Sequence, residues 1–572
     1  SRGMGRSLWG LILTAVIVTV LLVSGTAYGQ ANPEFRAMWV DCVADHSGLF
    51  SIAEINKLLG VPGDPNKIGD LREANCNAAI IEVRRAGKCI YDSALGEPWL
   101  TSFDALQGVL DRAHDTTGGK KRIEVHAWIV TFNTGGGKIW GDHMDADNPD
   151  NFWCTLTDTG ALSSAYMWDP GHPKVQKYIV DVMMDLVTNY DVDGVHYDYI
   201  RFNAANEGYN PTSIARYNAR HGTSGKPSPS DDRFDQWRRD QITGIVRQVY
   251  ARIQAVKPHV LQSGSFVTWN PSPTASTDAA WKTTRPYGNR SDGVFSDWDA
   301  WMKEGIMDVG IPMNYYDDAL RPADYVRWSN FIKDRSYNRH MVIGPALYKN
   351  FLSNNDVINQ ILATREPSPA GNYCAGFCGF SYYAPYVVTK ETGYGNWDTF
   401  EPVFRAQVCP TWADIPDRPW KSNPTKGHIS GSITFEGTGA WADGATVTIS
   451  GPEGRTQICD GTGFYAFIDV TPGTYVVTAS MPGYADAVRQ VSVGLGQVTG
   501  NMYVTDMTLG ATTQLVISGV SESGVTDNSA TITWTTNLPA DSQVEYGPTA
   551  SYGSTTVLDP NEVTSHSQTL SG

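Results

Sequence analysis

The hydrophobic positions in the first two thirds of the chain fall into eight short runs that predict β-strands. Each run is rich in β-branched and aromatic residues and ends near turn-forming residues. The runs cover residues 35–42, 77–85, 122–132, 193–202, 260–269, 307–316, 340–348 and 376–383. Helical patterns separate several of them. Eight strands that alternate with helices predict an α/β fold, a (β/α)8 TIM barrel over residues 33–415.

Two of the intervening segments carry a clear helical period. The first follows Pro173, a residue that suits the first turn of a helix. Its apolar positions are Val175, Ile179, Val182, Met183, Leu186, Val187 and Tyr190. The second covers about 231–256 and should end at Lys257, because Pro258 cannot continue a helix.

The pattern changes after residue 415. A Pro-rich segment at 416–427 reads as a linker, and short alternating strands with Gly and Pro turns follow it. Residues 428–510 contain "GATVTI", "CDGTGFYAF" and "PGTYVVTASMPGY", and this segment resembles the carboxypeptidase-regulatory-like domain. Residues 511–572 contain "NSATITWTTNLPADSQVEYG" and resemble a fibronectin type III domain without its final strands. Two all-β sandwich domains, the last truncated, are therefore expected after the barrel.

The N-terminal residues 1–29 have the layout of a secretory signal peptide. Arginines flank Met4, an apolar stretch follows from Leu8 to Val23, and small residues precede a cleavage point after Gly29. An uncleaved membrane anchor is the alternative. We expect a secreted, cell-surface or periplasmic protein, with the C-terminal β domains contributing to cell-surface or cell-wall association. Its eight cysteines form an even number that permits disulfides in an oxidising compartment, although the spacing does not define their pairing.

Composition narrows the class of partner. The formal charge of −16 argues against nucleic acid or an anionic membrane surface. Aromatic residues make up 11% of the chain, with 18 Trp and 27 Tyr. They can fill large cores, and they can also stack on the apolar faces of sugar rings.

The strand "DGVHYDYIRF" places candidate chemistry inside the barrel. Side chains alternate along a strand, so His196 and Asp198 share one face while Val195 and Tyr197 share the other. The apolar face suits packing against helices, so Asp198 should point inward at the C-terminal strand end, where barrel enzymes place catalytic groups. The alternative is that Asp198 only pairs with a nearby arginine and supports the loops.

Other strand ends add polar side chains with matching alternation. They are Glu82 and Arg84; Glu124, His126 and Trp128; and Met313, Tyr315 and Asp317. In a closed barrel these strand ends meet at one mouth. Carboxylates, histidine, arginine and aromatic rings together outline a sugar-binding pocket.

The barrel region resembles the bacterial glycoside-hydrolase-like family 10. The resemblance rests on "FRAMWVDC", "EVRRAGKCIYDSALGEPW", "VHAWIVTFN", "WDPGHPKVQKYIVDVMMDLVTNYDVDGVHYDYIRF", "DWDAWMKEGIMDVGIPMNYY" and "IGPALYK". It implies that Asp198 is a catalytic carboxylate acting on a glycan. The substrate-binding residues predicted from the resemblance and the strand ends together are Arg84, Tyr91, His126, Trp128, His196, Trp269, Tyr315 and Tyr348. Lys88 and Met313 depart from the residues that the family tends to have.

Glycoside hydrolysis usually needs two carboxyl groups. Asp317 is the predicted second group, and Asp318, Asp41 and Glu82 remain open. We therefore expect a secreted hydrolase of O-glycosidic bonds in a polysaccharide, with an N-acetylhexosamine as one candidate sugar and without a metal or cofactor. A non-catalytic glycan-binding or adhesion protein is the main alternative. A metal-dependent barrel hydrolase is disfavoured, because the eleven histidines form no His-x-His pair.

Overall fold

The structure of the chain is a computed structural model. It describes residues 33–42, 49, 51–134, 143, 151–164, 166–288, 292–317, 320–348, 354–383, 397–494, 502–511 and 515–571. The predicted signal peptide at 1–29 and the candidate Asp318 lie outside the described residues.

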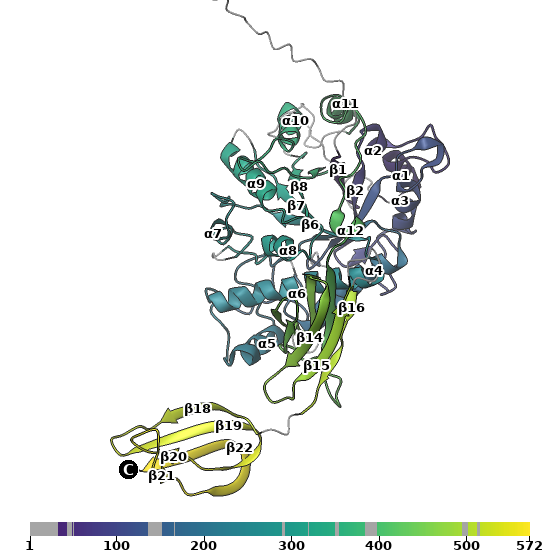
Figure 1. The fold of residues 1–572 in the computed structure, drawn as a ribbon. Coiled ribbons are helices and arrows are strands. Elements are labelled where there is room, and N and C mark those ends of the chain that lie inside the picture. The colour runs from purple at the N-terminus through teal and green to yellow at the C-terminus, as the bar shows by residue number, and fades with distance from the viewer. Residues whose placement is uncertain are drawn as a thin grey trace, which may run out of the picture.

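Within this part of the chain, eight parallel strands close into a barrel (Figure 1). They are β1 (Phe35–Val40), β2 (Ala78–Arg85), β4 (Glu124–Val130), β5 (Gly194–Asp198), β6 (Leu261–Val267), β7 (Val309–Asn314), β8 (His340–Pro345) and β9 (Gly376–Gly379). Pairing of β1 with both β2 and β9 completes the ring. Each strand falls within one predicted run, so the (β/α)8 prediction is confirmed. A two-residue strand, β3 (Lys88–Cys89), adds antiparallel to the end of β2.

Helices surround this ring. The longer ones are α1 (Ile52–Leu59), α3 (Ala105–Ala113), α4 (Pro173–Asn189), α5 (Pro211–His221), α6 (Asp232–Val256), α9 (Pro322–Asp334), α10 (Asn354–Ala363) and α11 (Trp397–Gln407). The shorter ones are α2 (Asp70–Glu73), α7 (Asp278–Trp281), α8 (Trp298–Glu304) and α12 (Pro419–Ser422), with a 3-10 turn at Thr117–Gly119. Helix α4 begins at Pro173 and α6 ends just before Lys257, as the sequence predicts.

Two apolar layers hold the barrel together. The outward faces of the strands pack on the helices, and Val195 and Tyr197 belong to that layer. A smaller cluster fills the barrel interior with residues such as Trp39, Ile80 and Trp128. The predicted alternation along β5 therefore holds, and His196 lies in the interior.

The second domain is a two-sheet β-sandwich, as predicted. One sheet contains β10 (Gly427–Phe435), β13 (Phe464–Val470), β16 (Met502–Val504) and β17 (Met507–Leu509). The other contains β11 (Thr446–Ser450), β12 (Arg455–Ile458), β14 (Gly473–Ser480) and β15 (Ala487–Val493). Their facing side chains form a separate apolar core that includes Ile429, Val447, Phe467 and Tyr475.

Residues 515–571 form a further β region. Strands β18 (Ile517–Ser523), β19 (Ser529–Ser542) and β22 (Asp559–Ser571) make one antiparallel sheet, and β20 (Glu545–Tyr546) pairs with β21 (Ser554–Thr555). Every residue of β18 is exposed. The resemblance of this region to a fibronectin type III domain stays a prediction.

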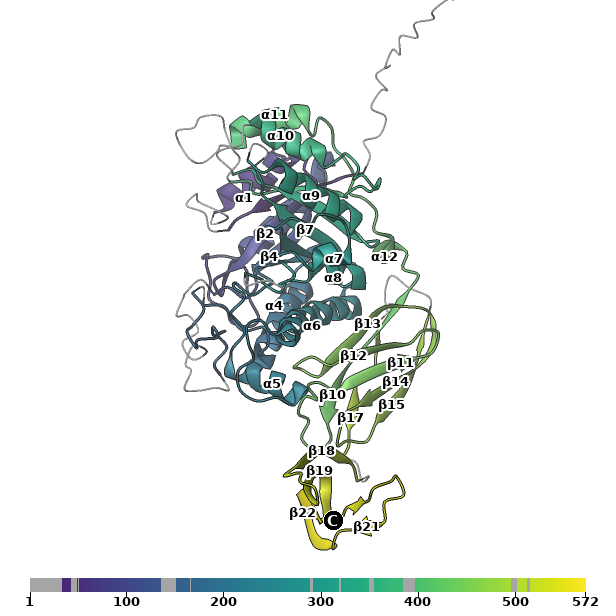
Figure 2. The ribbon, with the colours of Figure 1, turned by 90° about the vertical axis from the view of Figure 1, so that its left-hand side faces the viewer.

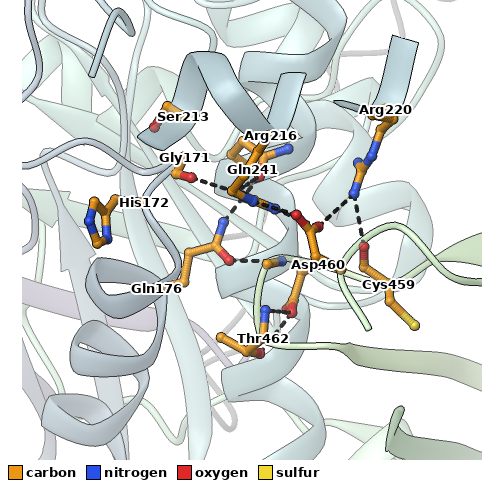
Figure 3. Close-up of polar contacts among 12 residues, drawn as sticks. Gly171, His172, Gln176, Ser213, Arg216, Arg220, Gln241, Cys459, Asp460 and Thr462 are labelled. Atoms are coloured by element: carbon orange, nitrogen blue, oxygen red, sulfur yellow. Dashed lines mark hydrogen bonds and ion pairs between the residues drawn. The ribbon is translucent and has the colours of Figure 1, made fainter. Parts of the chain in front are cut away.

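The sandwich packs along the outside of the barrel beside α5 and α6 (Figure 2). From α5, Arg216 binds both carboxylate oxygens of Asp443 at 2.6 and 2.8 Å, and Arg220 adds a bond of 2.9 Å. Figure 3 shows Arg220 also donating to the Cys459 carbonyl, at 3.1 Å. Apolar side chains of β13, among them Phe464 and Ile468, also belong to the barrel's outer apolar cluster, so polar and apolar contacts together join the two domains.

Residues 416–427, which the sequence assigns to a linker, close the N-terminal end of the barrel. Arg418 donates two hydrogen bonds of 2.8 and 2.9 Å to Glu124, the first residue of β4. Trp420 donates to Asp308, just before β7, and Lys421 pairs with the same carboxylate at 3.2 Å. Buried carboxylates at two strand starts need partners, and this segment supplies them.

Candidate active site

A cavity of about 1000 Å³ opens at the C-terminal ends of the barrel strands. Its position follows from the fold, because every strand of a parallel barrel ends at this face. The predicted residues that line it are Asp198, Asp317, Trp128, Trp269, Tyr315 and Tyr348. Further lining residues include Asp41, Glu82, Arg85, Arg201, Asn270, Arg285, Asp292, Arg321 and Phe380.

Asp198 ends β5 and is buried at the cavity wall. Its side chain is 12% exposed, with the Arg201 guanidinium 3.9 Å away. The next residue, Tyr199, has a φ of 51°, and its backbone N–H donates to Asp198 Oδ1 at 2.7 Å. Burial raises the pKa of the Asp198 carboxyl, while Arg201 and the Tyr199 amide oppose the rise.

Other carboxyl groups face the same cavity. Burial raises the pKa of Asp41, and the negative charge of Asp198 adds to the rise. Burial also raises the pKa of Glu82 to about 7, although Arg85 and the Cys42 amide oppose it. Asp317 accepts a hydrogen bond from the Leu320 amide at 3.3 Å, in the turn before α9. The cavity therefore contains several carboxyl groups, as general acid–base chemistry on a glycan would require.

Aromatic rings form much of the wall. Trp269 lies beside two guanidinium groups, with Arg285 at 4.4 Å and Arg201 at 5.1 Å from its ring. The rings of Tyr315 and Tyr348 each pack on the ring of Phe380, and the centroids are 5.7 Å apart in both pairs. Such rings offer flat apolar faces beside charged groups, an arrangement that suits the mixed polarity of a sugar.

Some buried polar atoms at this wall have no hydrogen-bond partner among the described residues. They include the Tyr315 hydroxyl and the side-chain oxygen of Asn270. Leaving such groups unpaired costs roughly 1–3 kcal/mol each. A polar ligand in the cavity could satisfy both.

Arg84 does not line the cavity, although alternation along β2 predicts it beside Glu82. The pairing of β2 with β4 shifts between Glu82 and Arg84, so the alternation breaks there. Arg84 instead binds Glu97 at 2.8 and 2.9 Å behind the strand and donates to the Val130 carbonyl. Arg85 takes the place at the cavity. No residue pattern in β2 signals this bulge.

Three other predicted binding residues also lie away from the cavity wall. Tyr91 is fully buried in the outer apolar layer, against Tyr190. His126 and His196 are fully buried in the barrel interior, where each ring contacts the Ser263 hydroxyl. Both histidines lie closer to the N-terminal strand ends than Asp198 does.

Three further observations concern metal ions, membrane spans and disulfides in the described residues. No group of three His, Cys, Asp or Glu residues suited to a metal ion occurs in the described ranges. Nor does any described helix have the length and apolar character needed to cross a membrane. All eight cysteines are described, and none is paired in a disulfide.

The fold and the cavity define a (β/α)8 barrel protein with carboxyl groups and aromatic rings around one cleft. The chain belongs to the glycosyl hydrolase-like 10 family, whose model matches residues 34–355. A second model, the carboxypeptidase regulatory-like domain, matches residues 428–509.

Curated relatives match the chain at low identity. Glycosyl hydrolase YngK of Bacillus subtilis is 28% identical over 375 residues, which cover 61% of this chain and 67% of YngK. Glycosyl hydrolase DigH of Escherichia coli K12 is 25% identical over 305 residues, which cover 50% of this chain and 65% of DigH. The chain thus spans about two thirds of the length of these relatives.

Among solved structures, the glycoside hydrolase domain of PgaB (BpsB) from Bordetella bronchiseptica is similar. The match has a TM-score of 0.45 at 12% identity and covers 65% of this chain and 98% of that domain. An α-L-fucosidase from Paenibacillus thiaminolyticus matches with a TM-score of 0.41 at 14% identity, covering 70% of this chain and 52% of the fucosidase.

Proposed function

We propose that the protein is an exported glycoside hydrolase that cleaves O-glycosidic bonds in a polysaccharide, with Asp198 as a catalytic carboxyl group. The observation that carries the proposal is the position of Asp198, a buried carboxyl at the end of β5 that faces a cavity of about 1000 Å³. Aromatic walls and unpartnered polar atoms around it suit a saccharide. Membership of a glycosyl hydrolase-like family supports the same class of substrate.

The mechanism needs a second carboxyl group in the same cavity. One group donates a proton to the leaving oxygen, and the other attacks the sugar or activates water. Asp317 is the partner we propose, because it follows β7 and lines the cavity. Glu82 is the rival candidate, since a pKa of about 7 would keep it partly protonated at neutral pH. Asp41 is the third.

The experiment measures release of reducing ends from a panel of bacterial glycans by the full chain. We expect Asp198→Asn to lower kcat by at least about 1000-fold while the circular dichroism and the melting curve remain those of a folded protein. Asp292→Asn is the matched control, because Asp292 lines the same cavity and pairs with Arg285 at 3.5 Å. It should retain most of the activity.

Parallel variants identify the second carboxyl. Asp317→Asn should lower kcat as strongly as Asp198→Asn, whereas Glu82→Gln and Asp41→Asn should have smaller effects. If the wild-type protein bound a glycan but did not cleave it, a non-catalytic glycan-binding or adhesion function would be favoured instead. Full activity in Asp198→Asn would refute the proposed role of Asp198.

A further inference from the structure

A continuous chain of buried hydrogen bonds runs through the barrel interior from the closed end toward the cavity. It begins with Arg418, which binds both carboxylate oxygens of Glu124. Glu124 contacts His126 Nε2 at 2.8 Å, and His126 Nδ1 contacts the Ser263 hydroxyl at 2.7 Å.

The upper half of the chain connects two strands that are not neighbours in the sheet. The Ser263 hydroxyl contacts His196 Nδ1 at 2.9 Å. His196 Nε2 lies 3.2 Å from the indole nitrogen of Trp39. The Trp39–His196 bond therefore crosses the interior between β1 and β5.

The chemistry of the two ends fixes the direction of each bond. An indole N–H can only donate, so His196 accepts at Nε2 and its Nδ1 carries the hydrogen given to Ser263. At the other end, a carboxylate can only accept, so His126 donates from Nε2. Its Nδ1 is then free to accept from the Ser263 hydroxyl. Every bond in the chain is satisfied in one arrangement of hydrogens.

The upper end of the hydrogen-bond chain lies beneath Asp198, the proposed catalytic carboxyl, and beneath Asp41, a second carboxyl of the cavity. His196 precedes Asp198 by two residues on the same strand face, and Trp39 precedes Asp41 in the same way. The Trp39 ring also packs edge-on against Phe380, a residue of the cavity wall, with centroids 5.8 Å apart. A shift of Trp39 or His196 would thus change the positions of the Asp41 and Asp198 carboxyl groups.

The lower end depends on the segment that closes the barrel. The side chain of Glu124 is 9% exposed and that of Arg418 is 13% exposed. Removing the arginine would leave a buried carboxylate without its cation, a change that commonly makes the remaining charge move or bind a proton. Because Glu124 bonds directly to His126, such a change would disturb His126, the next residue in the hydrogen-bond chain.

We propose that Arg418, at the opposite end of the barrel from the cavity, is a positioning residue that holds His196 and Trp39 beneath Asp198 and Asp41. It acts through Glu124, His126 and Ser263. The inference builds on the proposed function, since Asp198, one of the two carboxyl groups above His196 and Trp39, is the group assigned to catalysis.

The test compares two substitutions in the same short segment of the full chain. Arg418→Gln breaks the bond to Glu124, whereas Lys421→Gln removes a cation that pairs with Asp308 and has no contact with the hydrogen-bond chain. The readouts are the ring ¹⁵N resonances of His196 and the hydrogen exchange of the Trp39 indole N–H. The Trp39 indole signal and the His196 ring signals are assigned by their loss in the variants Trp39→Phe and His196→Gln.

We expect Arg418→Gln to move the His196 resonances and to speed exchange of the Trp39 indole N–H at least 10-fold, with Lys421→Gln close to wild type. On a cleaved glycan, kcat should fall by about 10- to 100-fold with a smaller change in KM, as expected for misplaced catalytic groups. Unchanged resonances in Arg418→Gln, or equal shifts in Lys421→Gln, would overturn the proposal. So would an unchanged kcat despite shifted resonances.

A further variant guards against misfolding. The double variant Arg418→Gln/Glu124→Gln leaves no unpaired charge, and the new amide oxygen can still accept from His126. It should restore the wild-type resonances, and failure to do so in a folded protein would count against the proposed route. If the wild-type chain cleaves no glycan, the proposed function fails, while the resonances still decide whether Arg418 holds His196 and Trp39.

Discussion

The backbone N–H of Tyr199 donates a hydrogen bond of 2.7 Å to the carboxylate of Asp198, the residue before it. This bond and the Arg201 guanidinium favour the charged carboxylate, but burial outweighs them and raises the pKa of Asp198. The folded protein therefore binds the Asp198 proton more tightly than the unfolded chain does. The site holds a carboxyl group whose ionised form is disfavoured by its own surroundings.

The first prediction follows from that balance. The stabilising effect of a carboxyl with a raised pKa is complete below its unfolded pKa and is lost as the pH rises through its folded value. Asp198→Asn removes the charge and should raise the melting temperature above that of wild type at pH 8. The two proteins should melt together near pH 3. A variant that melts below wild type at pH 8 would show that the ionised carboxylate is stabilising.

Glu82 gives a second prediction with a defined pH range. Its pKa of about 7 in the folded protein compares with 4.5 for an ordinary glutamate. Its stabilising effect should therefore disappear between about pH 4.5 and 7, by up to about 3 kcal/mol. Urea unfolding at several pH values should show this loss in wild type and a flatter profile in Glu82→Gln. Parallel profiles for the two proteins would contradict the raised pKa.

The third prediction concerns the aromatic wall. Trp269 lies against Arg285 and Arg201, and it offers a flat surface at the cavity. Trp269→Ala should raise KM for a cleaved glycan roughly 10-fold, equivalent to about 1.4 kcal/mol of binding, with a smaller effect on kcat. Trp441→Ala is the control, since Trp441 is an exposed residue of the sandwich domain. Equal KM values for the two variants would show that Trp269 does not contribute to glycan binding.

The sequence predicts the architecture well because each barrel strand is a short apolar run between turn residues. The alternation along β5 also places Asp198 at the cavity, and the order of the strands brings Trp128, Tyr315 and Asp317 to the same end. These features depend on local patterns and on the closed ring, both of which the sequence carries.

The features that sequence did not predict depend on tertiary contacts. A bulge in β2 exchanges Arg84 for Arg85 at the cavity, and it appears only in the pairing with β4. Arg418 lies in a Pro-rich stretch that has the composition of a linker, yet it pairs with Glu124 almost 300 residues earlier. Such a pairing has no local signal, because the alternation marks Glu124 as an inward-facing polar residue but does not indicate its partner.

The last prediction tests the contact between the barrel and the sandwich. Asp443 accepts from Arg216 and Arg220, and its side chain is 27% exposed. Asp443→Asn should lower the free energy of unfolding by about 1–2 kcal/mol, because two partly buried guanidinium groups lose a charged acceptor. Hydrogen exchange should rise in α5 and in the turn around Asp460.

Glu453→Gln is the matched control for that variant. It weakens an ion pair with Arg455 at 2.8 Å inside the sandwich and touches no residue of the barrel. Its effect on exchange should be confined to the sandwich, with α5 unchanged. If Asp443→Asn left exchange in α5 at the wild-type level, the bonds between Asp443 and the two arginines would not be what holds the domains together. The apolar contact of α6 with β13 and other polar bonds, such as that from Arg339 to Asp469 at 2.6 Å, would then be the basis for their packing.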